Sequence, residues 1–179
     1  MKLATTTGDF NGYTGCQIAS LRCIREAGFR YADYSFGFDH STRTGVYAED
    51  HEAYIERVKQ ACTDLGIRLV QAHSPMGTPL NDPDGRFLAD TLRCVDACGS
   101  WGIPNLVVHS GYTPGLSKEE TFEANKHFFL PILDRAEKYG TNILVENFNK
   151  MCIDGLYWID NATDLLRMIE VVDHPLFHA

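Results

Sequence analysis

Gly66-Ile67-Arg68-Leu69-Val70-Gln71 decides the fold, because its pattern of a glycine followed by a largely apolar run occurs four times in the chain. The other copies begin at Gly28, Gly102 and Gly140, so successive copies are 38, 36 and 38 residues apart. Glycine suits the end of a helix, where the left-handed backbone conformation costs it least. The run that follows is typical of a buried strand. The repeat therefore predicts four junctions at which a helix ends and a strand begins.

An amphipathic helix is predicted before each of these glycines, because apolar residues recur there at helical spacing. Ser117 is a good N-terminal cap for one of these helices, and two glutamates in its first turn suit the helix dipole. Pro131 lies within the same helix, so a kink or a break is expected there. The clearest helices are predicted over residues 50–65, 87–101, 117–139 and 161–172.

Strands alternating with helices indicate an α/β fold with a parallel sheet and right-handed crossovers. We expect strands over residues 2–6, 31–36, 68–73, 105–109 and 142–146, and the start of a sixth at 176–178. An open dinucleotide-binding sheet would carry the spacing G-x-G-x-x-G after the first strand, and residues 7–15 lack it. The pattern therefore favours a (β/α)8 TIM barrel.

Residues 1–179 are interpreted as a single domain, the N-terminal part of such a barrel. Eight units of this length would need roughly 290 residues, so about five units are present and roughly three are expected to be missing. An incomplete barrel exposes two sheet edges, and we expect a homo-oligomer or a partner chain to cover them.

Composition restricts the function. The net charge of −8 and the absence of any Lys/Arg cluster argue against a nucleic-acid partner. No apolar run approaches the roughly 18 residues of a membrane span, and the N-terminus does not resemble a signal peptide. The six cysteines, including Cys94 and Cys98 one helical turn apart, lack a second metal-type pair and are expected to be reduced and packed. These observations predict a cytoplasmic protein.

Three polar side chains occur where predicted strands end. His73 follows Val-Gln-Ala, His109 follows Leu-Val-Val, and Glu146 follows Ile-Leu-Val. The two histidines stand seven residues after their glycines and Glu146 stands six after its own, so all three should meet on one rim of the barrel. A carboxylate directly after an apolar strand is rarely tolerated unless it is paired or binds a metal. For His73 or His109 taken alone, a structural role is as open as a functional one. A structural role is the preferred interpretation of the remaining histidines, His40, His51, His127, His174 and His178.

The motifs His73-Ser-Pro, Val-Val-His109-Ser-Gly and Leu-Val-Glu146-Asn147, in this order and spacing, resemble the xylose isomerase-like TIM-barrel superfamily. That group includes sugar-phosphate isomerases and epimerases and the class II apurinic endonucleases. In its sugar-acting members a glutamate after strand five, an Asp-x-x-His segment from later strands and a final glutamate hold one divalent metal. By this resemblance Glu146 is the first metal ligand, and the other ligands are expected beyond Ala179.

The resemblance implies a sugar or sugar-phosphate isomerase or epimerase that needs Mn, Mg, Co or Zn and transfers a proton through an enediolate. Glu146 would be metal ligand and catalytic base, while His73, His109 and Asn147 would bind the substrate. Aromatic residues at the rim would pack on the sugar, and Arg43 or Lys150 would meet a phosphate. The aromatic candidates are Phe36, Phe38, Tyr112 and Trp158.

Two alternatives remain open. His73 and His109 match extra metal ligands of the apurinic endonucleases, so a metal-dependent phosphodiesterase is the second interpretation. The third is a non-catalytic truncated barrel. Because several ligands are expected outside residues 1–179, we predict that this chain has no turnover on its own.

Overall fold

The computed structural model describes residues 2–148 and 158–179. It contains a six-stranded sheet in which neighbouring strands are parallel and follow one another in chain order. The sheet does not close, since β1 and β6 lie at its two ends. This arrangement confirms the predicted α/β class and parallel order. The strands are β1 (Ala4–Thr6), β2 (Tyr31–Ser35), β3 (Arg68–His73), β4 (Asn105–Val108), β5 (Asn142–Val145) and β6 (Phe177–His178).

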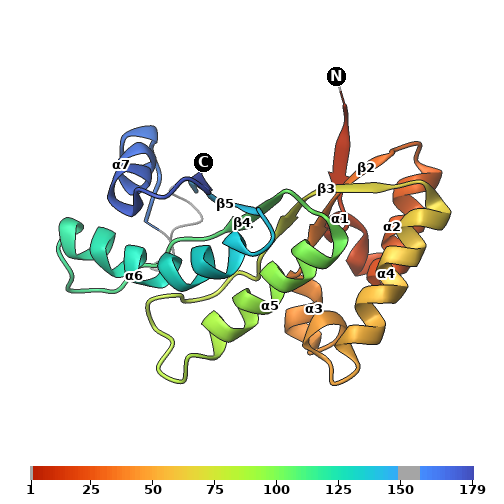
Figure 1. Ribbon diagram of the computed structural model, residues 1–179, viewed down its shortest axis with the longest axis horizontal. Coiled ribbons are helices and arrows are strands. Elements are labelled where there is room, and N and C mark those ends of the chain that lie inside the picture. The colour runs from red at the N-terminus through yellow and green to blue at the C-terminus, as the bar shows by residue number, and fades with distance from the viewer. Residues whose placement is uncertain (1, 149–157) are drawn as a thin grey trace.

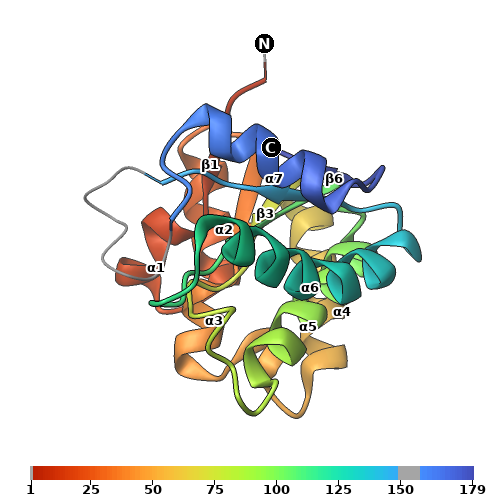
Figure 2. The same cartoon turned by 90° about the vertical axis from the view of Figure 1, so that its left-hand side faces the viewer.

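Helices join the strands and cover one face of the sheet, so the other face is the one that lines the interior of a barrel (Figure 1). Helices α6 and α7 lie side by side, as Figure 2 shows. The longer helices are α2 (Gln17–Glu26), α4 (His51–Leu65), α5 (Arg86–Trp101), α6 (Lys118–Glu137) and α7 (Ala162–Val172). Three short helices, α1 (Gly8–Thr14), α3 (Gly37–Thr42) and the 3-10 helix η1 (Gly45–Tyr47), follow β1 and β2.

The hydrophobic core lies between the sheet and the helices. Alternate strand residues such as Tyr34, Ala72, Leu106 and Val145 are buried in it. Because side chains of a strand alternate between its two faces, the residues between them point to the opposite face. These include Asp33 and Gln71, so the sheet carries polar side chains on the face away from the helices.

The repeated glycines adopt the positive φ angles that were predicted, between 61° and 94°. Gly66 and Gly102 directly follow the last residues of α4 and α5, in the left-handed conformation. Gly28 and Gly140 stand slightly beyond the ends of their helices, since α2 ends at Glu26 and α6 at Glu137. The predicted junctions are therefore present, with helix ends shifted by one or two residues at two of the four.

Helix α6 is one continuous helix of 20 residues with Pro131 inside it, so of the two outcomes expected at Pro131, a kink or a break, the break does not occur. Proline removes one backbone hydrogen bond and disfavours the preceding turn at a cost of about 3 kcal/mol. Phe128, Phe129, Ile132 and Leu133 surround Pro131 and are buried in the core. Their packing holds the helix together on both sides. The predicted cap at Ser117 is present as a full capping box with Glu120.

The cysteines that the structure describes are free thiols, and Cys94 and Cys98 are buried in the core. The Tyr47 hydroxyl lies 3.0 Å from Cys94 Sγ. Burial raises the pKa of the Cys98 thiol well above its usual value, which keeps it neutral. The sixth cysteine, Cys152, lies outside the described residues. Within residues 2–148 and 158–179, no helix has the length and apolar character needed to cross a lipid bilayer.

Candidate active site at the carboxyl ends of β3, β4 and β5

Strand register brings His73, His109 and Glu146 together at one end of the sheet. His73 is the last residue of β3 and pairs with Val107 of β4. His109 and Glu146 each follow directly after the paired residues Val108 and Val145 that end β4 and β5. His109 Nε2 lies 3.3 Å from Glu146 Oε2, and His73 Nε2 lies 3.9 Å from the same oxygen. The predicted strands had included His109 and Glu146, whereas both stand one residue beyond the strand ends.

The surroundings of Glu146 favour its ionised form. Its side chain is 43% exposed, whereas that of His109 is 4% exposed. The hydrogen bond from His109, together with the charges of His109 and His73, holds the pKa of Glu146 below its usual value against the opposing effect of burial. The ring of Phe148 packs edge-on against His109 at a centroid distance of 5.2 Å. Glu146 is thus an accessible carboxylate with a nearly buried imidazole behind it.

His73 is held from its other side by Asp33 of β2. His73 Nδ1 lies 2.7 Å from Asp33 Oδ2, and that oxygen also accepts a hydrogen bond of 2.9 Å from Gln71 Nε2. Thr6 Oγ1 donates to the other carboxylate oxygen at 3.3 Å. Burial by itself lowers the pKa of His73, but the hydrogen bond to Asp33 and the charges of Asp33 and Glu146 together raise it. Strands β1, β2 and β3 therefore all contribute to the position of one imidazole.

A buried asparagine on α6 fixes the loop that carries His109. Asn125 is fully buried; its Oδ1 accepts from the Gly111 N–H at 2.7 Å and its Nδ2 donates to the Gly111 carbonyl at 2.9 Å. Gly111 itself has no room for a side chain, because a Cβ atom would come within 3.0 Å of the Leu80 backbone nitrogen. The loop after β4 is therefore anchored two residues beyond His109.

Asn125→Ala is expected to lower the free energy of unfolding by about 1–3 kcal/mol, because it leaves buried polar groups of Gly111 without partners. Urea denaturation would measure the change, with Glu123→Ala at an exposed position of the same helix as the control. Equal stability of the Asn125→Ala variant and the control would contradict the anchoring role.

The donor atoms suit part of a metal site. Two ligands of one four-coordinate ion, each at about 2.0–2.2 Å from it, lie roughly 3.3–3.6 Å apart. The 3.3 Å between His109 Nε2 and Glu146 Oε2 falls in that range, and His73 Nε2 at 3.9 Å lies just outside it. Among residues 2–148 and 158–179, no group of three or more such side chains converges closely enough to hold an ion. The described residues fit a metal as a partial ligand set.

The other predicted substrate-binding residues are placed differently. Asn147 is exposed beside Glu146, and no hydrogen bond joins it to another residue in the described part of the chain. Phe36 was expected at the rim but is fully buried, because its side chain points to the helix face and stacks on Trp101 at 5.9 Å. Trp158 packs edge-on against Phe122 of α6, with 4.6 Å between the ring centroids. Phe38 is half-buried, and Tyr112 is 36% exposed.

Arg43 was expected to meet a substrate phosphate, but it is already paired within the protein. Its guanidinium donates two hydrogen bonds, of 2.6 and 3.3 Å, to the buried carboxylate of Asp90. His40 lies 3.2 Å from the same carboxylate, and His174 lies 3.2 Å from Glu137. These contacts agree with the structural role expected of both histidines. Lys150, the other candidate for a phosphate, lies outside the described residues.

Asp33, Gln71 and Phe148 are neighbours of the site that were not predicted from the sequence. Asp33 had a usable signal, since it is a carboxylate within a predicted buried strand and precedes the strand end by two residues. It pairs in register with Gln71, two residues before His73, so both point to the same face as the histidine. A second buried carboxylate, Asp39, follows β2 but accepts hydrogen bonds from Tyr34 and Tyr54 among the helices.

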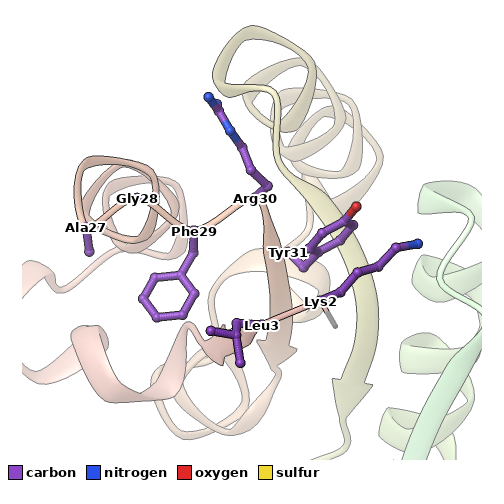
Figure 3. Close-up of a pocket in the computed structure, with 7 residues that line it drawn as sticks. All are labelled: Lys2, Leu3, Ala27, Gly28, Phe29, Arg30 and Tyr31. Carbon is purple, nitrogen blue, oxygen red and sulfur yellow. The ribbon is translucent and has the colours of Figure 1, made fainter.

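A separate pocket lies far from these residues, at the opposite ends of the strands. Figure 3 shows its lining, which comes from the residues before β1 and from the turn between α2 and β2. The pocket has a volume of about 500 Å³, and Lys2 and Arg30 are its charged residues. In TIM barrels the chemistry occurs at the carboxyl ends of the strands. We therefore do not assign the active site to this pocket.

Comparison with known proteins supports the same view of the fold. A family model described as "Xylose isomerase-like TIM barrel" matches residues 21–178. No curated protein sequence matches the chain.

Three solved structures illustrate the likeness. A family 2 AP endonuclease from Brucella melitensis is 17% identical with a TM-score of 0.76, covering 98% of this chain and 66% of its own. A D-allulose 3-epimerase from Methylomonas sp. is 15% identical with a TM-score of 0.72, covering 99% and 61%. A probable 3-DHS dehydratase from Bacillus anthracis is 14% identical with a TM-score of 0.72, covering 99% and 61%. The chain thus spans less than two thirds of the length of each, and identities this low establish the shared fold alone.

Proposed function

The chain belongs to the xylose isomerase-like TIM barrel family, and on this premise we propose that the whole protein is a divalent-metal-dependent sugar isomerase or epimerase. The observation that carries the proposal is the convergence of Glu146, His109 and His73 at the carboxyl ends of three neighbouring strands, with Glu146 accessible. The likeness to a D-allulose 3-epimerase is consistent with this activity. We further propose that residues 1–179 form the N-terminal part of the barrel and that the remaining ligands belong to the rest of the whole protein.

A bound divalent ion would supply Lewis-acid polarisation of the substrate carbonyl. Glu146 would help to hold the ion and would take the proton from the carbon beside the carbonyl. His109 would keep Glu146 ionised and fix its direction through the 3.3 Å contact. His73 would contact a substrate oxygen, and Phe148 would exclude water from the side of His109.

The proposal is tested by incubating the whole protein with free and phosphorylated ketoses after loading with Mn²⁺, Mg²⁺, Co²⁺ or Zn²⁺. We expect interconversion of sugar isomers that stops on chelation and returns when metal is added. Absence of conversion with every sugar and metal, together with cleavage of DNA at abasic sites, would reject it.

The second candidate is an apurinic endonuclease-like phosphodiesterase, favoured by the nearness of both histidine Nε2 atoms to Glu146. The net charge of −8 opposes a DNA substrate. His109→Asn separates the two, because it removes an imidazole and keeps hydrogen-bonding capacity.

In the isomerase, His109→Asn is expected to lower turnover while the amount of bound metal is unchanged. Elemental analysis of the purified variant against wild type and His127→Asn, an exposed control, would measure the metal. Loss of one metal equivalent in His109→Asn alone would favour the endonuclease.

A further inference from the structure

Asp33 is a buried carboxylate at a strand position where an apolar residue would be the usual choice. The residue is 8% exposed and lies in β2 between the core residues Ala32 and Tyr34, pointing to the opposite face of the sheet. Three groups surround its two oxygens within hydrogen-bond distance: Thr6 Oγ1, Gln71 Nε2 and His73 Nδ1. A buried carboxylate is tolerated when its oxygens accept several hydrogen bonds.

The contact with His73 determines where the imidazole proton lies. Asp33 Oδ2 accepts from Gln71 at 2.9 Å and is an acceptor only, so the short 2.7 Å contact requires a proton on His73 Nδ1. A neutral imidazole carries one proton, which leaves a lone pair on Nε2. That atom is the one aimed at the site, 3.9 Å from Glu146 Oε2.

We propose that Asp33 is a positioning residue that holds His73 in the Nδ1–H tautomer and so presents the Nε2 lone pair to the active site. The distance of 3.9 Å to Glu146 is too long for a direct hydrogen bond. Both atoms, His73 Nε2 and Glu146 Oε2, are acceptors, so a group that lies beside them would suit the site if it donated a hydrogen bond. Because the pKa of His73 is raised, this neutral form is populated above that pKa. If the proposed function holds, the donor is a substrate hydroxyl, from which the neutral His73 accepts.

Two substitutions distinguish a positioning role of Asp33 from a merely structural one. Asp33→Asn keeps an acceptor for His73, because the amide nitrogen can replace the oxygen that faces the Thr6 hydroxyl, and a hydroxyl can accept as well as donate. Asp33→Leu has similar volume but removes the acceptor altogether. The two variants therefore make opposite predictions for the proton on His73.

Two-bond ¹⁵N–¹H NMR of the purified protein at a pH where His73 is neutral reports the tautomer directly, with the His73 signals assigned by their absence in His73→Gln. Wild type and Asp33→Asn are expected to show an unprotonated Nε2. Asp33→Leu is expected to show a proton on Nε2 in most molecules, and Asp134→Leu, at an exposed position, should resemble wild type. A protonated Nε2 in neutral wild type would overturn the proposal even if Asp33→Leu did not fold.

Activity gives a second readout that separates this inference from the proposed function. Asp33→Leu should lower kcat for sugar conversion by about 10²-fold or more, the scale of effects from a wrong histidine tautomer, while Asp33→Asn retains more of it. Failure of the sugar assays with the expected NMR result would reject the isomerase and leave the role of Asp33 intact. The expected sugar activity together with a protonated Nε2 would support the isomerase and reject the role of Asp33.

Discussion

Glu146→Gln in the whole protein is expected to lower sugar turnover by roughly 10²–10⁴-fold, the usual effect of losing a general base. Glutamine keeps the volume and one acceptor oxygen, but it loses the negative charge that a metal and an acidic proton both require. The charge is accessible in the structure, with His109 Nε2 at 3.3 Å. Steady-state kinetics measures the loss, and metal analysis should show weaker metal retention.

Glu123→Gln makes the same chemical change at an exposed position of α6 and should leave turnover unchanged. Turnover by Glu146→Gln within a factor of about two of this control would remove Glu146 from the chemistry, because a general base is worth far more than that.

Phe129→Ala is expected to lower the free energy of unfolding by about 3–5 kcal/mol, as large aromatic truncations in a core do. Phe129 is fully buried on α6, and its ring lies 4.8 Å from that of Phe177 on β6. The truncation would leave a cavity between the helix layer and the last described strand.

Urea denaturation followed by circular dichroism measures the change, with His127→Ala as an exposed control on the same helix. A loss no larger than that of the control would contradict the assignment of the part of α6 before Pro131 to the core.

The order of strands was predictable from sequence because its signals are local. A glycine with positive φ and an apolar run recur at nearly constant spacing, and both depend on residues adjacent in the chain. The meeting of His73, His109 and Glu146 was also predictable, since parallel strands place equivalent positions at one end of a sheet. The sequence alone could not predict that α6 continues through Pro131 without a break, because this depends on tertiary packing around the proline.

The errors at the site arise from side-chain direction and from partners distant in sequence. Phe36 follows β2 as a rim residue would, but strand alternation turns it into the core. Arg43 is paired with Asp90, 47 residues away, and nothing in the local sequence signals that pair. Asp33 and His73 are 40 residues apart, so their contact becomes visible only once β2 and β3 are in register.

Hydrogen exchange at the carbon beside the sugar carbonyl would show whether Glu146 moves the proton at that carbon. The whole protein, loaded with metal, is incubated with a ketose in deuterated water, and NMR follows deuterium entering that carbon. We predict incorporation by wild type that chelation abolishes and that Glu146→Gln slows by at least about 10²-fold, as expected when a general base is lost. Incorporation by Glu146→Gln at the wild-type rate would contradict the assignment of Glu146 as the base that moves this proton.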